Sequence, residues 1–114
     1  MIKILGENMK KTIYNKLVRD KIPQIIEEDG KTYSIDILSD EDYNILLDEK
    51  LTEELFEYQQ SKDIEELADM YEVMLAIVKL KGYTQEQFEQ IRKEKLDRRG
   101  GFMDRVFLKE VFEN

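Results

Sequence analysis

Apolar residues recur at helical intervals through most of the chain and predict several helices joined by short breaks. Ser39 and the three acidic residues after it favour a helix N-terminus, so we expect a long helix over residues 39–60. Ser61 or Asp63 should begin a second helix that reaches about residue 81. Because the break between them is short, these two helices should pair as an antiparallel hairpin.

The region after Gly82 predicts a third helix and then an irregular tail. Thr84 and Gln87 have the spacing of a capping box, which should open a helix that runs to about Asp97. Residues 98–101 read Arg-Arg-Gly-Gly and indicate a loop. The apolar residues of 102–112 should pack back on the body of the domain or on a partner subunit.

The N-terminal part contains one short predicted helix. Asp20 is a plausible cap for it, Pro23 lies in its first turn and Gly30 ends it. The residues at 13–19 should form an extended or irregular arm, and the alternation at 32–38 permits a short strand or an extended link.

Together these elements predict an all-α fold. Its core should be the antiparallel helical hairpin, which forms part of an oligomeric helix bundle and carries a short extended N-terminal arm. We expect one helical domain over residues 13–114, and we expect residues 1–12 to be a disordered extension.

Composition limits the chemistry that the chain can perform. The 114 residues carry a net charge of −8, which disfavours binding to nucleic acid or to an anionic membrane. Cysteine and histidine are both absent, so a metal ion must be held by oxygen atoms, as Mg²⁺ and Mn²⁺ prefer. Because no apolar run is long enough to span a bilayer and no signal-peptide pattern appears, we expect a cytoplasmic protein.

The first long helix carries an acidic residue on its apolar face. Glu54 falls near the middle of that face, Glu57 lies at its edge, and Glu53 lies outside it. A carboxylate on an apolar face costs several kcal/mol unless it is paired or binds a metal. The apolar positions of this face are Tyr43, Leu46, Leu47, Leu51, Leu55 and Tyr58.

The second long helix repeats this anomaly with Glu66 and Asp69, which lie at the N-terminal end of an apolar stripe. Its later turns are apolar nearly all round, so we expect it to be central and buried on more than one side. The stripe consists of Val73, Ala76, Ile77 and Leu80.

The spacing of these acids predicts that they meet across the hairpin. Glu54/Glu57 and Glu66/Asp69 are each i, i+3 pairs, so each pair projects from one helix face at a similar distance from the bend. Divalent cations would relieve the repulsion between four such charges. The alternative is that these acids are solvated surface residues, which are common in a chain with 39% charged residues.

Three sequence motifs resemble those of a known group of enzymes. Glu53-Glu54-x-x-Glu57 followed by Glu66-x-x-Asp69 resembles the EExxE…ExxD signature of the all-alpha NTP pyrophosphohydrolases, which include MazG, dimeric dUTPases and phosphoribosyl-ATP pyrophosphohydrolase. The segment at 14–23 resembles the MazG-like branch whose members open with "KLVRDKIP", and the segment at 98–102 resembles the "RGGF" near the C-terminus of that branch. The resemblance covers about residues 13–108.

This resemblance implies hydrolysis of nucleoside triphosphates between the α- and β-phosphates, giving a monophosphate and pyrophosphate, as a house-cleaning activity on non-canonical nucleotides. It implies a homodimer or homotetramer that uses Mg²⁺ or Mn²⁺. By motif, the metal ligands would be Glu54, Glu57, Glu66 and Asp69.

The remaining roles are hypotheses on the same basis. Glu57 or Glu53 would orient the attacking water or accept its proton. The candidates for binding phosphate, each of which could equally be a solvated surface charge, are Lys16, Arg19, Lys21, Lys95, Arg98 and Arg99.

Two alternatives remain open at this point. One is the hydrolysis of phosphoribosyl-ATP, against which the "KLVRDKIP" segment argues. The other is a non-catalytic helical module for oligomerisation or adaptor binding, in which the acids are solvated or hold a structural ion.

Overall fold

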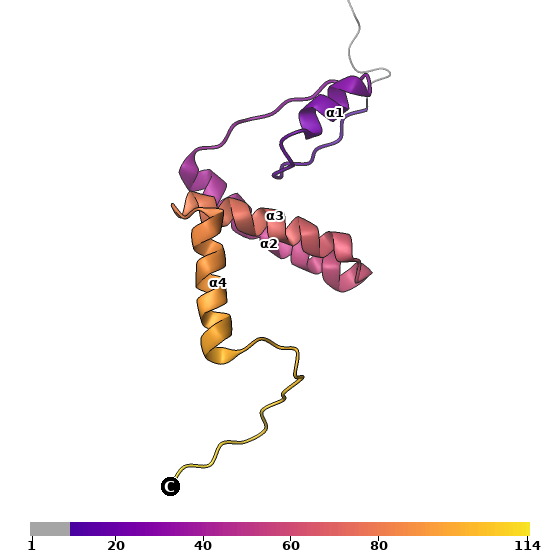
Figure 1. The fold of residues 1–114 in the computed structure, drawn as a ribbon. Helices are drawn as coiled ribbons and strands as arrows, with labels where there is room; N and C mark the ends of the chain where they lie inside the picture. The colour runs from indigo at the N-terminus through magenta and orange to yellow at the C-terminus, as the bar shows by residue number, and fades with distance from the viewer. Residues whose placement is uncertain (1–9) are drawn as a thin grey trace, which may run out of the picture.

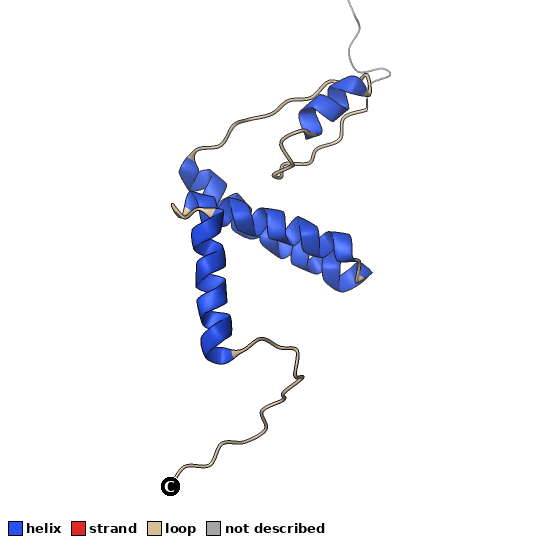
Figure 2. Cartoon of the chain, in the orientation of Figure 1, coloured by secondary structure: helices blue, strands red, loops and turns tan. Residues whose placement is uncertain are grey.

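The computed structural model describes residues 10–114, and every regular element in that part of the chain is a helix (Figure 2). The fold class predicted from the sequence, all-α, therefore holds for these residues. Of the predicted N-terminal extension, residues 1–9 lie outside the described residues, and residues 10–12 belong to no helix. The helices are α1 (Ile22–Glu28), α2 (Asp40–Ser61), α3 (Ile64–Leu80) and α4 (Gln85–Arg99).

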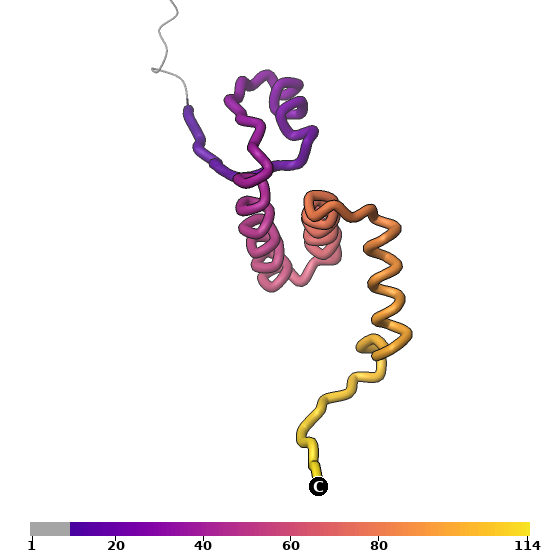
Figure 3. Tube along the Cα trace, turned by 90° about the vertical axis from the view of Figure 1, so that its left-hand side faces the viewer, coloured from indigo at the N-terminus to yellow at the C-terminus, as the bar shows by residue number. Residues whose placement is uncertain are grey.

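The centre of the fold is an antiparallel hairpin of α2 and α3, which lie side by side in both views (Figures 1 and 3). The bend depends on Lys62, which takes a left-handed conformation with φ of 61° and donates its backbone N–H to the Tyr58 carbonyl at 2.7 Å. The Ser61 hydroxyl accepts a hydrogen bond of 3.1 Å from the backbone N–H of Asp63 and so fixes the start of α3. Leu47 of α2, only 3% exposed, is the buried apolar residue of this hairpin.

Two of the predicted helix starts are confirmed by their hydrogen bonds. At the start of α2, the Ser39 hydroxyl accepts a hydrogen bond of 3.2 Å from the backbone N–H of Asp42. At the start of α4, Thr84 and Gln87 form both bonds of the capping box, at 2.9 and 3.0 Å. Each side chain thus satisfies a backbone N–H that the helix itself leaves unpaired.

Several local predictions were wrong. The residue before α1 is Lys21 rather than Asp20, and it makes no side-chain capping bond. The segment at 32–38 forms no strand, which leaves the extended link, the other form that its alternation permits. Helix α4 continues through Arg98 and Arg99, so these residues are not in a loop; the chain leaves the helix at Gly100, whose φ is 79°.

The single chain exposes far more surface than a compact protein of its size. Its accessible area is 11390 Å², whereas a folded monomer of this mass is expected to expose roughly 6,600 Å². Its radius of gyration is 20.9 Å, against about 13 Å for a compact domain of this length. The hairpin alone therefore does not enclose a core of ordinary size.

Apolar residues at the C-terminal end are among the most exposed of the chain. The tail beyond α4 runs away from the helices (Figure 1), and Phe102 and Phe107 are 96% and 85% exposed. The expectation that the tail packs back on the body is therefore wrong for the single chain. Packing on a partner subunit stays a prediction.

Helix α3 is also less covered than its sequence predicts. No α3 side chain is fully buried, and the stripe from Val73 to Leu80 is only partly covered. Helix α2 packs along one side of α3 and α4 contacts it only slightly, while α1 packs on no other helix. The prediction that this helix is buried on more than one side therefore fails for one copy of the chain. No helix in residues 10–114 is long and apolar enough to cross a membrane.

We predict that Thr84→Ala destabilises α4 by about 1 kcal/mol, because the backbone N–H of Gln87 loses the hydroxyl that accepts its hydrogen bond. Amide hydrogen exchange of residues 85–99 should become several-fold faster. Thr52→Ala is the matched control, since the Thr52 hydroxyl only bonds the carbonyl of Asp48 inside α2 and alanine is the better helix former. Equal protection of α4 in wild type and Thr84→Ala would contradict the prediction.

Candidate metal centre

Helix α2 places three carboxylates on adjoining parts of its surface. One carboxylate oxygen each from Glu53, Glu54 and Glu57 lies within 4.8 Å of the others. Glu54 is only 6% exposed, as its position on the apolar face predicts. Its Oε2 atom is buried and has no hydrogen-bond partner among the described residues. A buried carboxylate oxygen without a partner is costly, so this atom is a candidate for binding a cation or a water molecule.

Helix α3 brings Glu66 and Asp69 to the same place. One oxygen each from Glu54, Glu66 and Asp69 lies within 4.8 Å of the others, so Glu54 belongs to both acidic groups. The Oε2 atom of Glu66 is likewise buried without a partner among the described residues. The structure therefore brings together, close to the bend of the hairpin, the carboxylates that the sequence singled out.

The acidic cluster disturbs the protonation of its own members. Burial raises the pKa of Glu54; a hydrogen bond with Lys50 opposes this rise, and the charges of Glu57 and Asp69 add to it. Burial also raises the pKa of Glu66, and the nearby Glu57 and Asp69 raise it further. Both shifts show that burial, together with the neighbouring carboxylates, disfavours the ionised form of these two groups.

Three cations lie at the edge of the cluster. Lys50 is 3.3 Å from an oxygen of Glu54 and 3.4 Å from one of Glu53. Lys16 lies 3.0 Å from the other oxygen of Glu53, and Arg19 pairs with Asp69. Burial raises the pKa of Glu53, but the two lysines outweigh this effect and leave the pKa below its ordinary value.

The predicted phosphate-binding residues fall into two sets. Lys16 and Arg19 reach the acidic cluster. Lys21 lies immediately before α1 and makes no ion pair with any residue of 10–114. Lys95, Arg98 and Arg99 lie on α4, which leaves from the far end of the hairpin and is not brought to the cluster (Figure 1).

Lys50 was missed by the sequence analysis as a member of the site. The available signal was its spacing, since it precedes Glu53 by three residues and Glu54 by four and so lies on the same helix face.

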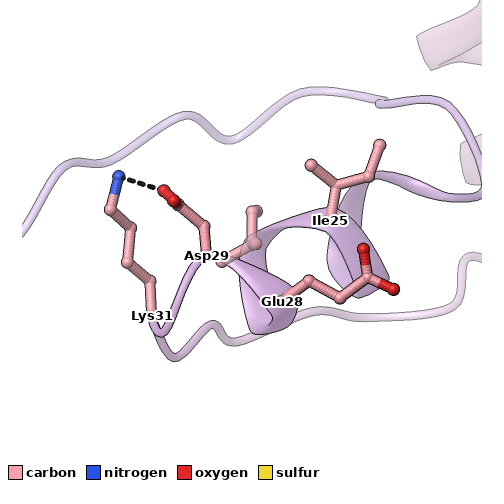
Figure 4. A pocket seen from close by; sticks show the side chains of 5 residues that line it. Ile25, Glu28, Asp29 and Lys31 are labelled. Atoms are coloured by element: carbon pink, nitrogen blue, oxygen red, sulfur yellow. Dashed lines mark ion pairs between the residues drawn. The ribbon is translucent and has the colours of Figure 1, made fainter.

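The shallow recesses of the surface lie elsewhere. One is lined by residues of α1 and the turn after it, where Lys31 and Asp29 form an ion pair at 2.9 Å (Figure 4). Another is lined by Glu94, Asp97 and Arg98 on α4. Neither recess contains the clustered acids, so neither competes with the cluster as a candidate site.

The donor set of the cluster fits a hard divalent cation. Its ligand atoms are carboxylate oxygens, two of them are buried and unpaired, and acids from two helices approach a common point. Mg²⁺ and Mn²⁺ accept such oxygen ligands and leave positions for water or phosphate. The cluster is therefore a chemically suitable cation site.

Comparison with known proteins gives little further information. No family model matches the chain, and no solved structure matches it. A segment of 42 residues is 50% identical to an uncharacterized protein from Mycolicibacterium smegmatis. The match covers 37% of this chain and 43% of that protein, so the chain spans less than half the length of this relative.

We predict that Glu54→Gln stabilises the metal-free protein more strongly as the pH rises. Because the folded-state pKa of Glu54 lies above the ordinary value of 4.5, its contribution to stability is complete below about 4.5 and is lost as pH rises through the raised pKa. The neutral glutamine escapes this loss. Urea denaturation in chelator across this range should therefore show a growing advantage for the variant.

The matched control for this measurement is Glu72→Gln, an exposed residue of α3 that belongs to neither acidic group. Its stability difference from wild type should not change with pH in the same direction. An advantage of Glu54→Gln that stays constant with pH, or shrinks, would show that the carboxylate is not strained in the folded state.

Proposed function

We propose that the chain is a Mg²⁺-dependent nucleoside triphosphate pyrophosphohydrolase that acts on non-canonical nucleotides. The observation that carries this proposal is the pair of buried, unpartnered oxygens of Glu54 and Glu66, in an acid-rich site to which two helices contribute. The motif order that resembles the MazG-like "KLVRDKIP" branch supports the reaction type.

In this proposal the metal ligands are Glu54, Glu57, Glu66 and Asp69. Mg²⁺ or Mn²⁺ bound there would supply positive charge to the phosphates and make a nearby water more acidic. The surrounding protein then has two tasks, which are to hold the triphosphate and to accept a proton from the attacking water.

The proton acceptor in this proposal is Glu57 rather than Glu53. Glu53 already accepts hydrogen bonds from Lys16 and Lys50, and its lowered pKa makes it a weaker base. We therefore assign proton acceptance to Glu57 and assign to Glu53 the positioning of the two lysines.

Phosphate binding falls to Lys16 and Arg19, since these are the predicted cations that reach the cluster. Arginine suits this role because its planar group offers two parallel hydrogen bonds to phosphate. Lys95, Arg98 and Arg99 could approach a cluster only if it belonged to a second copy of the chain.

The proposal includes a homo-oligomer. The accessible area exceeds that of a compact monomer by several thousand Å², so one chain has ample surface left over for an extensive subunit interface. The apolar stripe of α3 and the exposed tail at 102–112 are the surfaces that a second copy would bury. These surfaces also favour the alternative of a helical oligomerisation module, which the activity test separates.

We predict that Glu54→Gln and Asp69→Asn each lower Mg²⁺-dependent pyrophosphate release from a panel of canonical and modified (d)NTPs by on the order of 100-fold or more. Phosphoribosyl-ATP belongs in the panel as the competing substrate. Glu72→Gln should keep wild-type activity.

If the wild type releases no pyrophosphate from any compound while remaining helical and oligomeric, the adaptor alternative is correct. Full activity in both cluster variants would place the chemistry outside the cluster.

We predict that the protein sediments as a dimer or tetramer at micromolar concentration. Ile77→Lys should shift it toward smaller species, because a charge then lies in the apolar stripe of α3. Glu72→Lys, which changes an exposed position of the same helix, should not. A helical wild-type monomer at that concentration would contradict the oligomer.

A further inference from the structure

The N-terminal arm reaches into the acidic cluster from a distant part of the sequence. Lys16 donates to Glu53, which lies 37 residues further along the chain, and Arg19 donates to Asp69, which lies 50 residues further along. Contacts over such separations are not by-products of local helix geometry. They require the arm to lie against the hairpin.

The two arm residues neutralise different parts of the cluster. Arg19 pairs with Asp69, which shares its acidic group with Glu54 and Glu66. Lys16 pairs with Glu53, which belongs to the other group. The arm therefore supplies positive charge to the rim of the cluster and leaves the inner oxygens unpaired.

The strength of these contacts suits a reversible attachment. Arg19 is 58% exposed at its side chain and Asp69 is 36% exposed, and ion pairs at such exposure contribute little to stability. Because α1 packs on no other helix, no helix–helix contact holds this part of the chain to the hairpin. The arm can thus leave the cluster at small cost.

We propose that Arg19, assisted by Lys16, is an electrostatic latch that occupies the rim of the cation site until nucleotide arrives. A cation entering alone must compete with Arg19 for Asp69. When a cation and a triphosphate enter together, the arginine exchanges its carboxylate partner for a phosphate oxygen, which offers the same hydrogen-bond geometry. The inference rests on the cation site of the proposed function.

The latch makes the binding of cation and nucleotide cooperative. Without nucleotide, the released arginine has no anionic partner, so cation binding loses the ion pair. With nucleotide, the pair is replaced, so each ligand favours the other by the same factor. The arm thus protects the site from binding a free cation and adapts it to a cation–triphosphate complex.

The test is calorimetric titration of Mn²⁺ into wild type, Arg19→Ala and two controls, first alone and then with a non-hydrolysable α,β-methylene triphosphate. Arg92→Ala removes an arginine from an exposed ion pair on α4, with Glu89. Lys21→Ala removes a positive charge near the arm that has no partner in the cluster.

Arg19→Ala should bind Mn²⁺ alone about two- to fivefold more tightly than wild type, the range that an exposed ion pair supports. The same variant should lose most of the tightening that the triphosphate produces in wild type. Both controls should behave as wild type in the two titrations.

Unchanged or weaker binding of Mn²⁺ alone by Arg19→Ala overturns the latch, as does equal tightening by Lys21→Ala, which would indicate a general effect of charge. Wild type and variant that both fail to bind Mn²⁺ also overturn it. Tighter Mn²⁺ binding in a protein that hydrolyses no triphosphate would keep the latch and remove the proposed reaction. Hydrolysis of a triphosphate without this tightening would keep the proposed reaction and remove the latch.

Discussion

The central constraint on this structure is a repulsion between clustered carboxylates, which the chain's own cations do not fully relieve. Acidic side chains from α2 and α3 approach within 4.8 Å, and two of their oxygens are buried without partners. Lys50, Lys16 and Arg19 neutralise the rim, yet the pKa values of Glu54 and Glu66 stay raised. A divalent cation at the centre would relieve this repulsion, and the proposed chemistry, the latch and the pH dependence all follow from that need.

The sequence was sufficient for the hairpin and for the position of the acids. Helix periodicity and the capping residues at Ser39 and Thr84 are local signals, and the structure satisfies both with the expected hydrogen bonds. The burial of Glu54 followed from its position on the apolar face of its helix. That position predicts burial whichever helix packs on the face. The distances of Glu66 and Asp69 from the bend also predicted that they lie opposite Glu54.

The errors arose where the result depends on distant contacts. The sequence did not show that α4 would carry Arg98 and Arg99 away from the cluster, because the direction of α4 depends on its packing against α3. The pairing of Arg19 with Asp69 joins residues 50 positions apart and has no local signature. The uncovered stripe of α3 has the same origin, since the periodicity of a helix does not show which elements of the chain pack on it.

The most direct test of the central claim is the anomalous scattering of a crystal grown with Mn²⁺. We expect a peak bound by oxygens of the proposed ligands Glu54, Glu57, Glu66 and Asp69, with the guanidinium of Arg19 no longer on Asp69. A fully ordered cluster with no peak, in which those carboxylates contact only Lys50 and Arg19, would contradict it.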